Sequence, residues 1–134
     1  MATLIEKIRK SILDNPELNV VLKSNEFSDD TIRDSIDYAV EEINLRYNPQ
    51  TNYSANKIPY HILLPGVIVS LLNKVYIHGQ RNSIQFRDGG TSFDLFGQRA
   101  AQALQALQKY EVEFDKKVRH YKARIAASYY SGPI

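Results

Sequence analysis

The chain has 134 residues, of which 43% are hydrophobic and 24% are charged, and its net charge is +2. This length suits one domain with a buried core, and the composition is that of ordinary globular proteins, which excludes a fibrous or wholly disordered chain. The absence of cysteine excludes disulfide frameworks, thiol catalysis and zinc sites built from thiolates. We expect a single domain over residues 1–134.

Neither the amino-terminal residues nor the longest apolar run indicates export or membrane insertion. The first fifteen residues carry frequent charges and no uninterrupted apolar stretch of the kind found in secretory signals. The longest apolar run, residues 62–72, contains Pro65 and Gly66 and is shorter than the ~20 residues that span a bilayer. We expect a protein made in the cytoplasm, with no membrane partner.

The first half of the chain predicts two helices. Apolar residues at helical spacing predict a short amphipathic helix over residues 2–13, and residues 16–27 form a connector that packs either as a short helix or as extended chain. Ser28 is a typical N-cap, and Asp29 and Asp30 suit the first turn of the helix that follows. This second helix should end near residues 46–48, before Pro49, and residues 48–57 should form a surface loop.

The third predicted helix starts near Pro59. Pro65 and Gly66 indicate either a kink or a fresh helix start. Residues 67–77 are apolar on nearly every face, which is typical of the most buried helix of a bundle. Gly79 is a plausible left-handed residue at its end.

A long last helix is predicted from residue 97 to about residue 128. Its apolar stripe would face the core, and its length of ~45 Å exceeds what a small domain needs, so part of it should meet another molecule. Residues 129–134 should form an extended tail, because Gly132 and Pro133 stop the helix. Seven basic and three acidic residues lie between Arg99 and Arg124, which indicates either a solvated face or a patch for an anionic partner. The possible patch comprises Lys116, Lys117, Arg119, Lys122 and Arg124.

Between the third and last helices the pattern changes to alternation. Residues 83–87 and 91–95 alternate apolar and polar side chains around Asp88, Gly89 and Gly90, which predicts a β-hairpin with these three residues in its turn. A connector folded onto the core is the other interpretation. The expected fold is therefore mainly α: a small bundle of about four helices, with one β-hairpin before a long C-terminal helix.

The sequence offers no convergent set of catalytic groups. His61, His78 and His120 lack the spacing that places two metal ligands on one helix face, and no P-loop lysine follows the glycines at 89 and 90. We therefore expect no enzyme activity, no catalytic residue, no cofactor and no metal. The hairpin has a different implication, because a lone ribbon leaves two strand edges that another chain could cover. Such contacts, repeated head to tail, close into a ring.

The pattern of the chain resembles the head-tail connector (adaptor, or head-completion) proteins of tailed bacteriophages. The resemblance covers residues 27–128: a helix from Ser-Asp-Asp to Tyr-Asn-Pro, a buried apolar helix, the segment SIQFRDGGTSFDL, and Gly-Gln before a long charged helix. It implies a structural virion protein at the head-tail interface, forming a ring, typically a dodecamer, that joins the portal protein to a tail or neck protein. DNA would pass through the channel without specific binding, which suits a near-neutral chain.

The resemblance also implies contact residues. The hairpin would contact a neighbouring subunit or the tail through Phe86, Arg87, Asp88, Gly89, Gly90, Thr91, Phe93 and Phe96. The tail would dock on the portal through Tyr129, Tyr130, Pro133 and Ile134. Two alternatives stay open: a tail-completion, neck or baseplate structural protein, and a small helical DNA-binding regulatory module that uses the basic patch.

Overall fold

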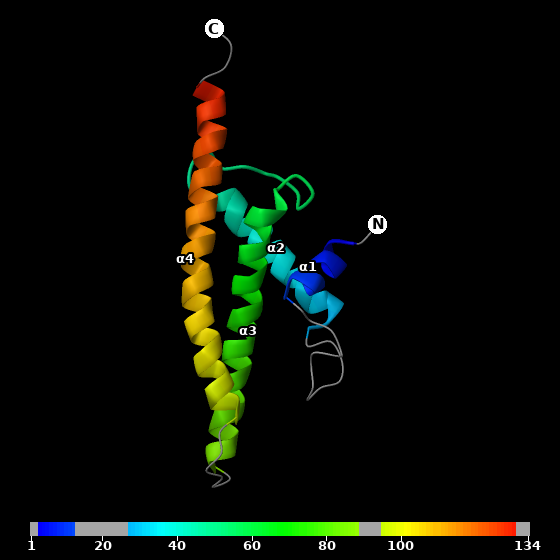
Figure 1. Ribbon diagram of the computed structural model, residues 1–134, viewed down its shortest axis with the longest axis vertical. Coiled ribbons are helices and arrows are strands. Elements are labelled where there is room, and N and C mark those ends of the chain that lie inside the picture. The colour runs from blue at the N-terminus through cyan, green and yellow to red at the C-terminus, as the bar shows by residue number, and fades with distance from the viewer. Residues whose placement is uncertain (1–2, 13–26, 89–94, 131–134) are drawn as a thin grey trace.

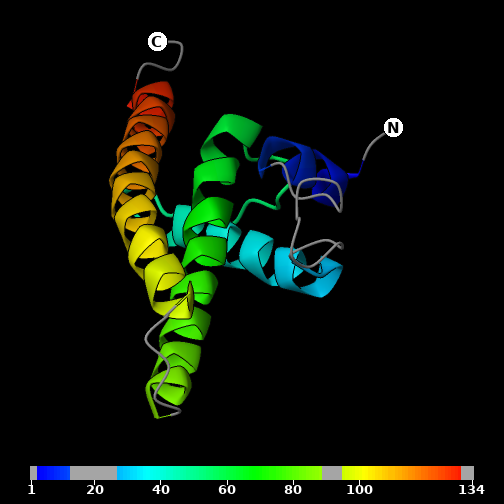
Figure 2. The ribbon, with the colours of Figure 1, turned by 60° about the horizontal axis from the view of Figure 1, so that its bottom comes forward.

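The computed structural model describes residues 3–12, 27–88 and 95–130. This part of the chain is mainly helical, as expected, and its helices are α1 (Leu4–Ile12), α2 (Asp29–Leu45), α3 (Tyr60–Asp88) and α4 (Leu95–Tyr130). α3 and α4 run antiparallel, side by side, while α2 crosses them and α1 lies beside α2 (Figure 1). The view in Figure 2 shows that α2 crosses α3 at a steep angle.

The core lies where α2 crosses the first half of α3 and the second half of α4. Apolar residues at helical spacing on α2 meet the N-terminal half of α3, and Ile8 of α1 closes one side. Each fully buried isoleucine contributes roughly 1.5–3 kcal/mol to folding. Beyond this core, α3 and α4 continue as a two-helix projection, and the other end of α4 extends past the loop that follows α2 (Figure 1). The principal core residues are Ile8, Ile32, Ile36, Ala39, Ile43, Ile62, Leu63, Val67, Phe114 and Val118.

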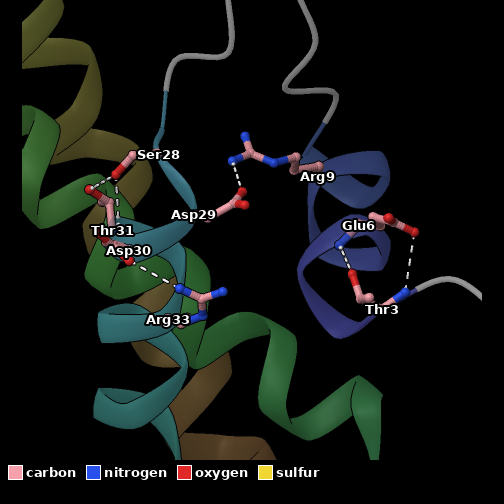
Figure 3. A network of polar contacts seen from close by, with 8 residues as sticks. All are labelled: Thr3, Glu6, Arg9, Ser28, Asp29, Asp30, Thr31 and Arg33. Carbon is pink, nitrogen blue, oxygen red and sulfur yellow. Dashed lines mark hydrogen bonds and ion pairs between the residues drawn. The ribbon is translucent and has the colours of Figure 1, made fainter.

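Local capping chemistry fixes the starts of α1 and α2 (Figure 3). Thr3 and Glu6 form a capping box, in which the Glu6 amide donates to Thr3 Oγ1 and the Thr3 amide donates to Glu6 Oε2, each at 3.2 Å. Ser28 is the N-cap of α2, as predicted, and its Oγ accepts from the Thr31 amide at 3.1 Å. Arg9 bonds Asp29 at 2.7 Å and so joins the two helices.

α3 is one continuous helix through Pro65 and Gly66. Pro65 has no amide hydrogen, so the carbonyl of His61, four residues earlier, loses its usual helical partner. The ammonium of Lys117 on α4 donates to this carbonyl at 3.4 Å. Gly66 lets the helices approach closely, because a Cβ there would lie 2.7 Å from Phe114 ring atoms and 2.9 Å from the Ala39 Cβ.

The predicted β-hairpin and the predicted helix end at Gly79 are both wrong. α3 runs on through Gly79 to Asp88, so residues 83–87 are helical, and Leu95 begins α4. Residues 89–94 lie outside the described residues. The physical reason is tertiary, because a lone ribbon buries little surface whereas an extended α3 has α4 beside it. That contact outweighs the roughly 1 kcal/mol that a glycine costs inside a helix.

α4 has 36 residues and is therefore ~54 Å long. It starts two residues before the predicted position and includes Tyr129 and Tyr130, which we expected in the tail. Residues 131–134 lie outside the described part. The middle of the predicted inward stripe is confirmed, since Phe114 and Val118 are fully buried and Leu107 and Tyr121 pack on the core. Leu104 and Ile125, at the two ends of the predicted stripe, are half-buried and lie outside this cluster.

Within the described residues, one segment, Tyr60–Ile77, is long and apolar enough to cross a membrane by length and composition. In this structure its most apolar residues supply much of the core, as expected for the central helix of a bundle. Other residues of this segment, such as His61, Asn73 and Ile77, are exposed.

Candidate interaction surface

The C-terminal end of α2 is fastened to α4 through Asp115. Arg46, the C-cap of α2, donates to Asp115 Oδ1 at 3.1 Å and to Glu42 Oε2 at 3.1 Å, and its guanidinium lies 4.9 Å from the centre of the Phe114 ring. This cation is therefore held by two carboxylates and by an aromatic face. The contact spans 69 residues of sequence.

Tyr47 completes this contact from an unusual backbone conformation. Its φ of 59° lies in the left-handed region, which costs a non-glycine residue ~1 kcal/mol or more. Its hydroxyl donates to Asp115 Oδ2 at 2.6 Å. This hydrogen bond, followed by burial and the negative charge of Asp115, raises the pKa of Tyr47. Asp115 thus receives donors on both carboxylate oxygens.

Lys122 is a fully buried cation that holds the loop after α2. Its Nζ donates to the carbonyl of Asn44 at 3.1 Å and to the carbonyl of Pro49 at 2.7 Å. No carboxylate pairs with it in the described part of the chain, and burial lowers its pKa. The Asn44 carbonyl lies in the last turn of α2, at the negative end of the helix dipole, where a cation is favoured. Lys122 therefore has a structural role.

Asn44 fixes the same loop from the α2 side. Its Oδ1 accepts from Thr51 Oγ1 at 2.8 Å and from the Tyr53 amide at 3.0 Å, while its Nδ2 donates to the Tyr53 carbonyl at 3.0 Å. The predicted surface loop at residues 48–57 is present, and these bonds give it a defined path across the end of α2.

A shallow, open groove lies beside this contact, between the end of α2 and the middle of α4. Arg46 and Asp115, at its α2 side, are already paired with each other. Val112, whose side chain lines the groove, is 71% exposed. The groove is too open to enclose a small ligand, and it suits contact with another macromolecule. It is lined by Arg46, Gln108, Glu111, Val112, Asp115, Lys116 and Arg119.

The outer face of α4 is basic over residues 109–119. Lys109, Val112, Lys116 and Arg119 follow the spacing i, i+3, i+7, i+10, so they share one helix face, and all four are exposed. This face lies opposite the buried residues Phe114 and Val118. Its three cations have no ion-pair partner within the residues that the structure describes.

The structure divides the basic patch predicted from the sequence. Lys116 and Arg119 lie on the outer face of α4, and Arg124 is exposed elsewhere on that helix. Lys117 is engaged by Glu113 at 3.1 Å as well as by the His61 carbonyl. Lys122 is buried, so its assignment to a patch for an anionic partner is wrong, because its charge is turned inward to backbone carbonyls.

The residues expected at a hairpin contact lie in separate elements. Phe86, Arg87 and Asp88 belong to the last turns of α3 and Phe96 to the first turn of α4, while Gly89, Gly90, Thr91 and Phe93 lie outside the described residues. For the tail, Tyr129 and Tyr130 end α4, and Pro133 and Ile134 lie outside the described part.

The burial of Lys122 and the outer face of α4 were not predicted, although the sequence contains signals for both. Lys122 lies four residues after Val118 and eight after Phe114, so helical periodicity alone places it on the buried face. Lys109 and Val112 complete the outer face at the same spacing as Lys116 and Arg119. Grouping the basic residues by proximity in sequence hid this arrangement.

Among the described residues, no group of three or more His, Asp or Glu side chains is placed to hold a metal ion. Comparison with known protein families, with curated proteins and with solved structures finds no match to this chain.

Proposed function

We propose that the chain is a structural virion protein: a head-tail connector subunit of a tailed bacteriophage, which forms a ring between the portal and the tail. The observation that carries the proposal is the shape of the α3–α4 pair, which extends well beyond the core that α1 and α2 build (Figures 1 and 2). A domain that only had to cover its own core would not need a helix of ~54 Å. Such a projection supports contacts with neighbouring subunits.

The surface chemistry also supports an assembly role. The groove is open, is bordered by charged side chains and contains an exposed valine, as expected of an area that meets another protein. A net charge of +2 suits a conduit through which DNA slides without being gripped.

The docking assignments belong to the same proposal. The far end of the α3–α4 pair, with residues 86–96, would contact a neighbouring subunit or the tail, and residues 129–134 would dock on the portal. A tail-completion, neck or baseplate protein would share this ring architecture but would have a different partner.

The experiment is cryo-electron microscopy of the intact virion, combined with virions whose copy of the protein carries an affinity tag. We expect a ring of this chain between portal and tail, and we expect particles lacking the protein to have filled heads without tails. A position at the distal end of the tail would assign the protein to the baseplate. Its complete absence from purified virions would refute a structural role.

A further inference from the structure

The outer face of α2 is as acidic as the outer face of α4 is basic. Asp30, Asp34, Asp37 and Glu41 follow the spacing i, i+4, i+7, i+11, and all four are exposed on the side opposite the buried isoleucines. Asp30 pairs with Arg33 at 3.0 Å. The other three have no ion-pair partner within the described part of the chain.

Each charged face also carries one exposed aliphatic side chain. Leu45 follows Glu41 by one helical turn and is 56% exposed, while Val112 on α4 is 71% exposed and precedes Lys116 by one turn. An acidic stripe ending in a leucine on one helix thus matches a basic stripe containing a valine on the other.

We propose that the acidic outer face of α2 in one copy of the chain packs on the basic outer face of α4 in the next copy. This inference goes beyond the proposed function, because it identifies a contact between two copies of the chain that does not depend on their closing into a ring. Two different faces of one chain meet, so the contact is heterologous and propagates from subunit to subunit. The partner is a second copy because the complementary charges and exposed apolar groups lie on the same chain.

The spacing of the residues sets the direction of the two helices. With Leu45 against Val112, an antiparallel arrangement places Glu41 opposite Lys116, since each lies four residues away, or ~6 Å along its helix. Asp37 lies eight residues before Leu45 and Arg119 lies seven residues after Val112, so these two side chains are also near each other. A parallel arrangement would place Glu41 near Lys109 but would leave Lys116 and Arg119 beyond the end of α2, so it would form one ion pair instead of two. The antiparallel register is therefore favoured.

The first test uses charge reversal in the full-length chain. Variant A is D37K/E41K and variant B is K116E/R119E, and self-association is followed by sedimentation at low and high salt. Each variant removes two exposed ion pairs and places like charges opposite each other, so we expect each variant to self-associate roughly tenfold more weakly than wild type. Mixing A with B, or combining all four substitutions in one chain, should restore association. K10E/K57E, which reverses two exposed lysines away from both faces, is the matched control for B and should behave as wild type.

The second test uses the absence of native cysteine. Chains carrying L45C alone and V112C alone are mixed under mild oxidation, so that any mixed disulfide must join two molecules. We expect the mixed pair to cross-link at least several-fold more than either variant alone, and more than L45C mixed with K57C.

The outcomes separate this contact from the proposed function. If wild type assembles and variants A and B assemble equally well, the contact is wrong and the ring proposal stands. If wild type is monomeric at every concentration and salt, and L45C and V112C do not cross-link, self-association through these faces is refuted. If B instead loses salt-sensitive binding to duplex DNA that wild type shows as a monomer, the basic face serves a nucleic acid and the contact is refuted.

Discussion

Gly66 is the position where the smallest change should have the largest effect on the fold. In Gly66→Ala the new Cβ would lie 2.7 Å from two Phe114 ring atoms and 2.9 Å from the Ala39 Cβ. Phe114 and Ala39 are both fully buried, so neither can move into solvent to relieve the overlap. The three helices would have to separate.

The expected size of the effect follows from two opposing terms. Overpacking of a filled core costs ~1–3 kcal/mol. Because three helices converge at Gly66, the cost should lie in the upper half of this range. Because alanine has a higher helix propensity than glycine, the replacement also raises the free energy of unfolding by roughly 1 kcal/mol. Gly66→Ala should therefore lower the free energy of unfolding by about 1–2 kcal/mol and the melting temperature by roughly 4 °C per kcal/mol for a chain of this size.

Urea unfolding followed by circular dichroism measures this change. Asn73→Ala and Asn73→Gly, at an exposed position of α3, give the helix-propensity difference without a clash. In a Phe114→Leu background, where the ring is gone and only the overlap with the Ala39 Cβ stays, Gly66→Ala should destabilise the protein less than it does in wild type. The explanation by steric overlap is refuted if Gly66→Ala is as stable as wild type, or is equally harmful with Leu at position 114.

The remaining predictions concern polar contacts. Lys122→Met leaves the Pro49 carbonyl without its donor, so it should lower the free energy of unfolding by ~1–3 kcal/mol, as measured by urea unfolding. Burial lowers the pKa of Lys122 below its ordinary value of 10.5, so between the folded and the unfolded pKa the folded chain binds fewer protons than the unfolded chain. The difference in free energy of unfolding between wild type and Lys122→Met should therefore grow as the pH rises through this range. A difference that shrinks would contradict this prediction. Asp115→Asn should lower the pKa of Tyr47 towards its ordinary value, which an NMR titration of ring-labelled tyrosine will detect; an unchanged pKa would mean that Asp115 is not the cause. Ser28→Ala removes the N-cap of α2 and should lower the free energy of unfolding, measured in urea, by ~1 kcal/mol. Ser28→Asp keeps a capping side chain and should leave this free energy unchanged. Equal losses in the two variants would argue against capping.

Local chemistry made the starts of the helices predictable. Ser28 and the two acidic residues after it mark the N-terminus of α2 within one turn, and Pro59 marks the start of α3. The buried face of α4 was equally predictable, because helical periodicity identifies the apolar face without any knowledge of the helix that packs on it.

The failures have a common cause in long-range packing. Gly79 and the alternation at residues 83–87 favour a helix end and a strand locally, and only the presence of α4 alongside makes a longer helix better. The groove joins Arg46 to residues 108–119, and the bonds of Lys122 reach back 73 and 78 positions, so sequence spacing within one element could not reveal them.

The adjacent residues Pro65 and Gly66 also determine where the far end of the molecule lies. The carbonyl freed by Pro65 accepts from Lys117, and the Phe114 ring and the Ala39 Cβ lie against Gly66. A one-turn slip of ~5.4 Å between α3 and α4 would therefore lose the contacts with Lys117 and Phe114. From Gly66, α3 runs 22 residues to Asp88, or ~33 Å, so a tilt of only about 5° at this junction moves the tip by roughly 3 Å. A force applied at the tip of the helical pair therefore acts on the packing around Pro65 and Gly66. A change in this packing in turn shifts the position of the tip.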